Sequence, residues 1–203
     1  MSKPAFSRAE PDARRQSLIE ATARVLARDG ATGASVRAIA LEAGVSPGLI
    51  GHHFAGIDDL VGETYASVGQ QVHVALMAAV AAAGDNPRAR VTAYVTASFA
   101  PPIADRRLFA TWIAFWSLSA KPTIAARHDA LYQAYRDDLE ALLAACGLPA
   151  AERRLAAIAI TALVDGLWLE LCLSPGTFTP GEARSLAERQ LESYFDRSAK
   201  SSR

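Results

Sequence analysis

The chain is poor in cysteine and has no excess of charge of either sign. Its 203 residues include two cysteines, Cys146 and Cys172, a content that favours a reducing compartment over a disulfide framework. The 21 basic and 21 acidic side chains cancel, which excludes a globally basic nucleic-acid coat and a polyacidic disordered tail. The N-terminal residues lack the apolar stretch of a secretory signal. We therefore expect a cytoplasmic protein.

One apolar run is long enough to cross a membrane. It extends from Leu155 to Leu173 and contains Asp165 near its middle and Glu170 farther along. Each of these carboxylates would cost a few kcal/mol at the centre of a bilayer. The run therefore predicts a helix buried in protein, and no membrane partner.

Convincing strand patterns and internal repeats are also missing. Apolar residues recur at helical spacing, and glycine and proline separate the segments. The sequence predicts an all-α fold with a three-helix head, residues 1–55, and a larger helical body, residues 56–203. The expected helices are Asp12–Asp29, ended by Gly30; one capped by Ser35 and ended near Gly44; one capped by Ser46 with Pro47 in its first turn; one from Asp58 toward Ala83; and Pro87–Ala100, Asp105–Ser119, Thr123–Cys146, Ala150–Ser174 and Gly181–Arg197.

The segment from Ser35 to Phe54 has the layout of a helix-turn-helix. Ala40 is small where two helices would cross, Gly44 allows the tight turn, and Val45 fills the corner. Leu49 and Ile50 would pack the second helix against the first. In this motif the second helix lies in the major groove of DNA.

The same segment resembles the TetR family of bacterial transcriptional regulators. The matching residues are Ser35, Ile39, Ala40, Ala43 to Ser46, Gly48, Ile50, His52 to Phe54 and Leu60, preceded by Arg14, Arg15, Leu18, Ile19, Ala21 and Ala23 in the first helix. The resemblance implies a homodimer that binds a pseudo-palindromic double-stranded operator, acts as a repressor and is released by a small-molecule effector. The last two long helices would form the dimer contact, which agrees with the apolar surplus of the first of them.

The resemblance also implies which head residues contact DNA. Ser35 and His53 would lie near the phosphate backbone, with Arg37 beside them. The residues facing the groove would be Ser46, Pro47, Gly48, Leu49 and His52. Two alternatives stay open, because Leu49 also suits the core and the His52–His53 pair also suits a solvated surface. The chain departs from the family at His53, where tyrosine is usual, and at Ile57, where lysine is usual. Residues 1–60 carry seven basic and seven acidic side chains, so few phosphate contacts and a modest salt dependence are expected.

Aromatic residues in the body suggest a ligand site. Trp112, Phe115 and Trp116 fall on one helical face, and Asp165 lies three residues before Trp168. These two runs resemble the C-terminal half of the BetI-type branch of TetR regulators, which implies choline or a related quaternary amine as effector. Tryptophan faces attract such cations, and a desolvated carboxylate would supply the counter-charge. The expected ligand-binding residues are Phe109, Trp112, Trp116, Asp165 and Trp168. The alternatives are an ordinary aromatic core and, for Asp165 and Gly166, a dimer contact.

Two other classes of function compete with a regulator. A small helical enzyme would need a phosphate-cradling glycine motif, a nucleophile with its base or a metal cluster, and none stands out. We therefore expect no catalytic residue, cofactor or metal; neighbouring His52 and His53 do not face one point on a helix. A helical interaction module that only keeps the DNA-binding fold is the other alternative. The favoured hypothesis is a ligand-responsive transcriptional regulator.

Overall fold

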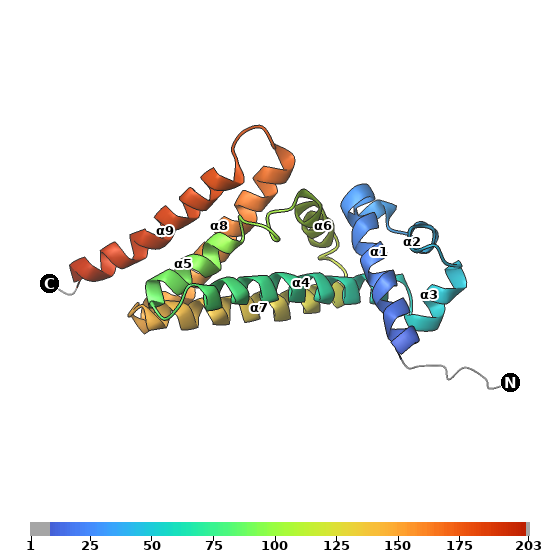
Figure 1. The fold of residues 1–203 in the computed structure, drawn as a ribbon, viewed down its shortest axis with the longest axis horizontal. Helices are drawn as coiled ribbons and strands as arrows, with labels where there is room; N and C mark the ends of the chain where they lie inside the picture. Colours follow the sequence, from blue (N-terminus) through green and yellow to red (C-terminus); the bar gives the residue numbers. More distant parts are fainter. Residues whose placement is uncertain (1–8, 202–203) are drawn as a thin grey trace. The chain divides into compact units, whose positions relative to one another are not determined.

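The computed structural model describes residues 9–201, with side chains described for 12–196, and over this range the chain is helical with no strand. The all-α prediction is confirmed (Figure 1). The helices are α1 Ala9–Gly33, α2 Val36–Ala43, α3 Pro47–His53, α4 Ile57–Ala82, α5 Pro87–Ala97, α6 Arg106–Ser117, α7 Pro122–Ala145, α8 Ala150–Leu173 and α9 Pro180–Ser201. The described residues form two compact units. The first unit consists of residues 9–68 and 110–128, and the second unit of residues 69–109 and 129–201.

The core of the head joins α1 to the two short helices. Leu18, Ile19, Ala21 and Val25 from α1 are buried together with residues of the next helices, namely Ile39, Ala40, Ile50, Phe54 and Leu60. Helical geometry in α1 breaks at Gly30, where φ is 67° and ψ is −172°, as predicted from its sequence position. One further helical turn to Gly33 follows, which the sequence pattern did not predict.

The turn between α2 and α3 depends on a glycine in the left-handed region. Gly44 has φ 68° and ψ 33°, and the N–H of Val45 donates to the Ala40 carbonyl at 2.9 Å. Ser35 caps α2, because its hydroxyl oxygen accepts the N–H of Ala38 at 3.2 Å. Ser46 stands before Pro47 at the start of α3, but its side chain forms no capping hydrogen bond. The expectation of a Ser46 side-chain cap is therefore wrong.

In the second unit, α4 and α7 cross closely at Gly69. The Tyr135 hydroxyl donates to the Gly69 carbonyl at 2.9 Å, and a Cβ at Gly69 would lie 2.4 Å from a methyl carbon of Leu131. Helix α9 packs against α5 and α8 (Figure 1). Its buried residues include Ala183, Ala187, Leu191 and Phe195. These contacts hold the second unit together around α5 and α9.

Helix α8 is only partly buried. It is the one helix in the described part of the chain that is long and apolar enough to cross a membrane, and a third of its most apolar window is buried. Ala156, Ala157 and Ile160 face the protein, whereas Leu155 and Leu173 are about two-thirds exposed, at 64% and 65%. The prediction of a helix buried in this protein thus holds for one face, and the second face is apolar but uncovered.

Replacing Gly44 tests the turn. In Gly44→Ala the Cβ meets no neighbour, so the cost is the left-handed backbone alone, about 1–2 kcal/mol. We expect amide exchange in α2 and α3 to show an opening free energy reduced by that amount. Gly44→Asn should lose less, because asparagine tolerates this conformation better. Equal exchange in all three proteins would contradict this account of the turn.

Candidate functional site

The residues predicted to face the DNA groove lie together on α3, and most of them are exposed. Ser46, Pro47, Gly48 and His52 are exposed, and Leu49 is half-buried. Ile50 and Phe54, which alternate with them along the helix, are buried in the core of the head. The sequence therefore divides α3 into an inner apolar side and an outer side free to meet a partner.

The predicted phosphate contacts lie beside this helix. Ser35 and Arg37 are exposed at the start of α2, and His53 is half-buried with its ring centroid 5.2 Å from that of His52. The Ser35 hydroxyl oxygen accepts a backbone N–H, which leaves its O–H as a donor for a phosphate oxygen. Arg37 forms no ion pair among the described residues. These groups are the donors that a phosphate backbone requires.

Two arginines of α1, Arg24 and Arg28, are already paired within the protein. Arg24 and Arg28 each bind a different oxygen of Glu42 at 2.7 Å, and Arg28 also binds Asp29 at 2.8 Å. The hydrogen bond from Arg24 is the main reason why the pKa of Glu42 lies below its usual value. Among the described basic residues of the head, Arg24 and Arg28 are thus less available for phosphate. The modest salt dependence expected from the balanced charge stays a prediction.

Glu63 ties α1 to α7 within the first unit. One of its oxygens accepts from Arg15 at 2.7 Å and the other from Arg127, while the Arg15 guanidinium also lies 4.9 Å from the centre of the Phe54 ring. The hydrogen bond from Arg15 is the largest influence that holds the pKa of Glu63 below its usual value. Sequence reasoning missed this network, because its partners are 48 and 64 residues apart.

The aromatic residues predicted to bind a ligand contact one another and their neighbours. In the first unit, Trp112 is 1% exposed and its ring centroid lies 5.7 Å from that of Tyr65. In the second unit, Phe109 and Trp168 are buried with ring centroids 5.1 Å apart, and the Trp168 indole N–H donates to the Ser98 carbonyl at 3.0 Å. Trp116 is half-buried. Of the five predicted residues, the structure thus brings Phe109 and Trp168 into contact.

Asp165 lies in the second unit, where a tyrosine hydroxyl is its hydrogen-bond partner. The Tyr132 hydroxyl donates to Asp165 Oδ1 at 3.1 Å, and no cation of the described residues pairs with this carboxylate. Burial raises the pKa of Asp165 to about 7, and the hydrogen bond from Tyr132 offsets only part of that effect. A carboxylate in this state gains most from a cation, because the cation would replace the solvation that burial has removed.

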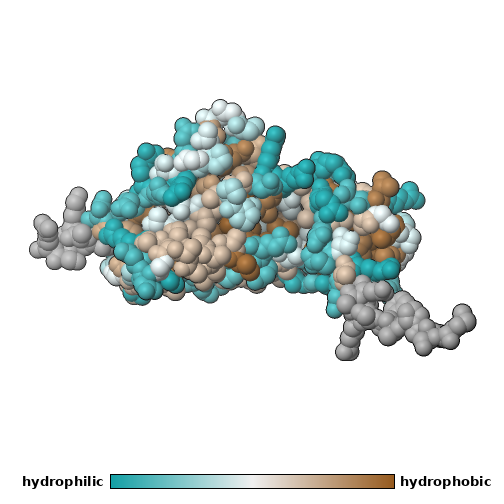
Figure 2. Space-filling model, viewed as in Figure 1, coloured by the Kyte–Doolittle hydropathy of each residue, from teal (hydrophilic) through white to brown (hydrophobic). Residues whose placement is uncertain are grey.

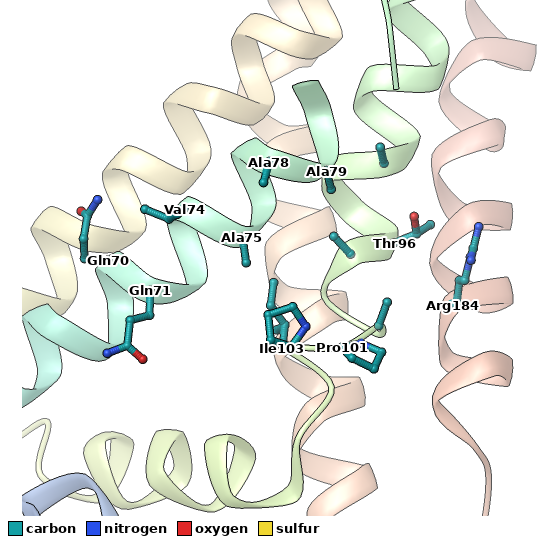
Figure 3. Close-up of a pocket in the computed structure, with 14 residues that line it drawn as sticks. Gln70, Gln71, Val74, Ala75, Ala78, Ala79, Thr96, Pro101, Ile103 and Arg184 are labelled. Carbon is teal, nitrogen blue, oxygen red and sulfur yellow. The ribbon is translucent and has the colours of Figure 1, made fainter. Parts of the chain in front are cut away.

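A cavity of about 750 Å³ lies elsewhere in the second unit (Figure 3). Residues of α4, α5, the segment after α5 and α9 line it, and none of the five predicted ligand residues is among them. Sequence reasoning missed it because alanine, which carries no recognisable chemistry, is the commonest residue of its walls, at six of the fourteen lining residues. Among the described residues, no group of three histidine, cysteine or acidic side chains is placed to hold a metal ion.

Known proteins resemble this chain over nearly its whole length. The profile of bacterial regulatory proteins of the tetR family matches residues 18–64, and that of the BetI-type transcriptional repressor C-terminal domain matches residues 87–196. The HTH-type transcriptional regulator BetI of Burkholderia thailandensis is 35% identical over 180 residues, which cover 88% of this chain and 92% of the relative.

Solved structures agree with these matches. A transcriptional regulator from Pseudomonas aeruginosa has 42% identity and a TM-score of 0.82, with 94% of each chain covered. A regulator from Saccharomonospora viridis, solved in complex with choline, has a TM-score of 0.75 over 89% of this chain and 96% of its own. Its identity is 21%, so that likeness concerns the fold.

Replacing Glu63 tests the network between α1 and α7. Glu63→Gln keeps the shape but removes the charge that Arg15 and Arg127 share, and for such half-exposed pairs we expect a loss of about 1 kcal/mol at neutral pH. Because the folded protein lowers the pKa of Glu63 from 4.5, the loss should shrink as the pH falls through the folded value.

Amide exchange in α1 at neutral and acidic pH measures this difference. Glu152→Gln is the matched control, because Glu152 is exposed and forms no ion pair among the described side chains. A difference that persists unchanged at low pH would show that shape, and not charge, carries the effect.

Proposed function

Because this chain belongs to the TetR family of transcriptional regulators, in its BetI-type branch, we propose that it is a repressor, released from its operator by a quaternary amine. Choline or a close analogue is the effector that this proposal names. The repressor would work as a homodimer on a pseudo-palindromic site and in the cytoplasm, where the DNA lies. It is a regulator and not an enzyme.

The outer side of α3 supports DNA recognition. The seven-residue helix α3 and the residue before it, Ser46, would offer Ser46, Pro47, Gly48 and His52 to a groove, while the inner side of the helix is anchored in the core. Arg37 and Ser35 lie at the start of the preceding helix, where they would fix the register on the phosphate backbone. The proposal of DNA recognition rests on one observation: these residues are exposed, while Ile50 on the opposite side of α3 is buried.

Uncovered apolar side chains on α8 and α9 support a homodimer. Leu155, Ile158 and Leu173 on α8 are 64%, 37% and 65% exposed, and Leu186 on α9 is 40% exposed. Water-facing leucines and isoleucine on two adjacent helices are typical of a subunit interface. A twofold interface would present two heads to two half-sites, which is why the operator is expected to be palindromic.

Asp165 supports a cationic effector. Its carboxylate is half-buried and lacks a cation among the described residues, and aromatic side chains are abundant in the same unit. A quaternary ammonium group would neutralise the charge of Asp165 and present its methyl groups to aromatic faces. The complex of the S. viridis relative with choline is consistent with this class of effector.

Release requires that the effector distinguish two states of the protein. An effector shifts the equilibrium only by the difference between its affinities for the DNA-binding state and the released state. By linkage, operator DNA would weaken effector binding by the same factor as the effector weakens operator binding.

Replacing Arg37 tests the DNA interface. Arg37→Ala should weaken binding to DNA upstream of the protein's own gene, and the slope of log affinity against log salt should fall by about 1 per lost phosphate contact. A mobility-shift titration at several salt concentrations measures this slope. Arg106→Ala is the matched control, since Arg106 is an exposed arginine of α6 outside the head. Equal slopes in the two variants would contradict the assignment of Arg37.

The pH dependence of choline binding tests the role of Asp165. Only the ionised carboxylate attracts a cation, and the pKa of Asp165 is about 7, so affinity should fall about tenfold per pH unit below that value. Calorimetry from about pH 5 to about pH 8 should also detect proton uptake by the buffer on binding.

Two variants separate this effect from a general one. Asp165→Asn should abolish the pH dependence and weaken binding, while Glu170→Gln, an exposed change on the same helix, should leave both unchanged. Choline binding that is independent of pH and unaffected by Asp165→Asn would refute the assignment.

A further inference from the structure

The 750 Å³ cavity of the second unit is a site that the proposed function does not use. Gln70, Gln71, Val74, Ala75, Ala78 and Ala79 line it from α4, facing α5, the loop after α5, and α9 (Figure 3). Its size falls within the range of small-molecule pockets. Figure 2 shows a pale brown, weakly apolar area over the second half of α4 and α5, the region that contributes most of these residues.

The walls of the cavity are small and apolar. Beyond α4 they are formed by Ala93, Ala97, Ala100, Pro101, Pro102 and Ile103. Neither an aromatic side chain nor a carboxylate is among the lining residues. A quaternary amine would therefore find neither a ring face nor a counter-charge here, whereas an alkyl chain would replace water against alanine, valine and proline.

Among the described residues that line the cavity, Arg184 is the one that carries a charge. It projects from α9 at the end near Thr96, and the two glutamines lie at the other end (Figure 3). Its Nε donates to Glu188 at 2.9 Å, which leaves the terminal nitrogens of the guanidinium as further donors. A guanidinium at one end of an apolar cavity is complementary to a carboxylate with an apolar body.

We propose that this cavity binds an apolar carboxylate, with its chain along α4 and its carboxylate at Arg184. The lining residues of α4 from Gln71 to Ala79 are eight positions apart, about 12 Å along the helix axis, which suits a medium-length chain. The site is separate from Asp165 in its residues and opposite to it in the charge of the ligand. The regulator would thereby receive a second chemical signal.

Three probes with the same chain test the ligand class. Decanoate, decanol and decyltrimethylammonium differ only in the head group, and calorimetry below their aggregation concentrations should rank their affinities in that order. One decanoate should bind per protomer. Cation binding as tight as decanoate binding, or uptake of several decanoates without saturation, would overturn the proposal.

Variants at the two ends of the cavity locate the ligand. Arg184→Gln should weaken decanoate binding about fivefold, a modest effect because the side chain of Arg184 is 53% exposed to solvent. Decanol binding should stay unchanged, because decanol carries no charge. Glu188→Gln should strengthen decanoate binding, since it removes the competing carboxylate. Arg189→Gln, an exposed change on the same helix outside the lining, is the control.

Filling the cavity gives an independent result. Ala79→Trp should abolish binding of decanoate and decanol, and Ala81→Trp, an exposed change on α4 outside the lining, should not. Circular dichroism should show that both variants keep the helical fold. Unchanged decanoate binding in Ala79→Trp would overturn the proposal. If the oligomeric mass of this variant changed at the same time, a second copy of the chain, and not a carboxylate, would be the occupant of the cavity.

The same variants separate this proposal from the effector proposal. Asp165→Asn should leave decanoate binding unchanged, and Ala79→Trp should leave choline binding unchanged. Loss of both ligands in either variant would contradict the existence of two independent sites.

Discussion

The DNA-binding surface depends on the packing of two helices that are too short to be stable alone. Helices α2 and α3 have eight and seven residues, below the length at which isolated helices persist in water. Burial of Ile39, Ala40 and Ile50 against α1 supplies the stability that the helices lack. The same packing fixes which side of α3 faces outward, so the residues proposed to face the groove form one exposed surface only while that core is intact.

Two carboxylates of the protein illustrate how charge can serve structure or binding. Glu63 shares its oxygens between two arginines, and its pKa is lowered. Asp165 has a tyrosine hydroxyl as its neighbour, and burial raises its pKa. The first carboxylate is satisfied within the folded chain and ties helices together. Asp165 lacks a counter-charge among the described residues, as expected of a carboxylate that binds a cationic ligand.

The local parts of the structure could be predicted from sequence, and the long-range parts could not. Ser35, Gly44 and Pro47 signal a cap, a turn and a helix start through chemistry within a few residues, and the structure places each at that point. Ring contacts such as Phe109 with Trp168, and the pairs formed by Glu63, join residues far apart in the chain. The cavity could not be predicted from the sequence for a different reason. It is defined by the space between helices, and Arg184 is the charged residue among those that line it.

The most direct test of the central claim is a mobility-shift assay of the wild-type protein on DNA upstream of its own gene, with and without choline, at two salt concentrations. We predict a specific shift that weakens with salt and is relieved by choline. A shift that choline does not change would contradict choline as the effector, but it would still support a DNA-binding regulator. No shift at low salt would contradict operator binding itself and favour an interaction module that keeps the DNA-binding fold.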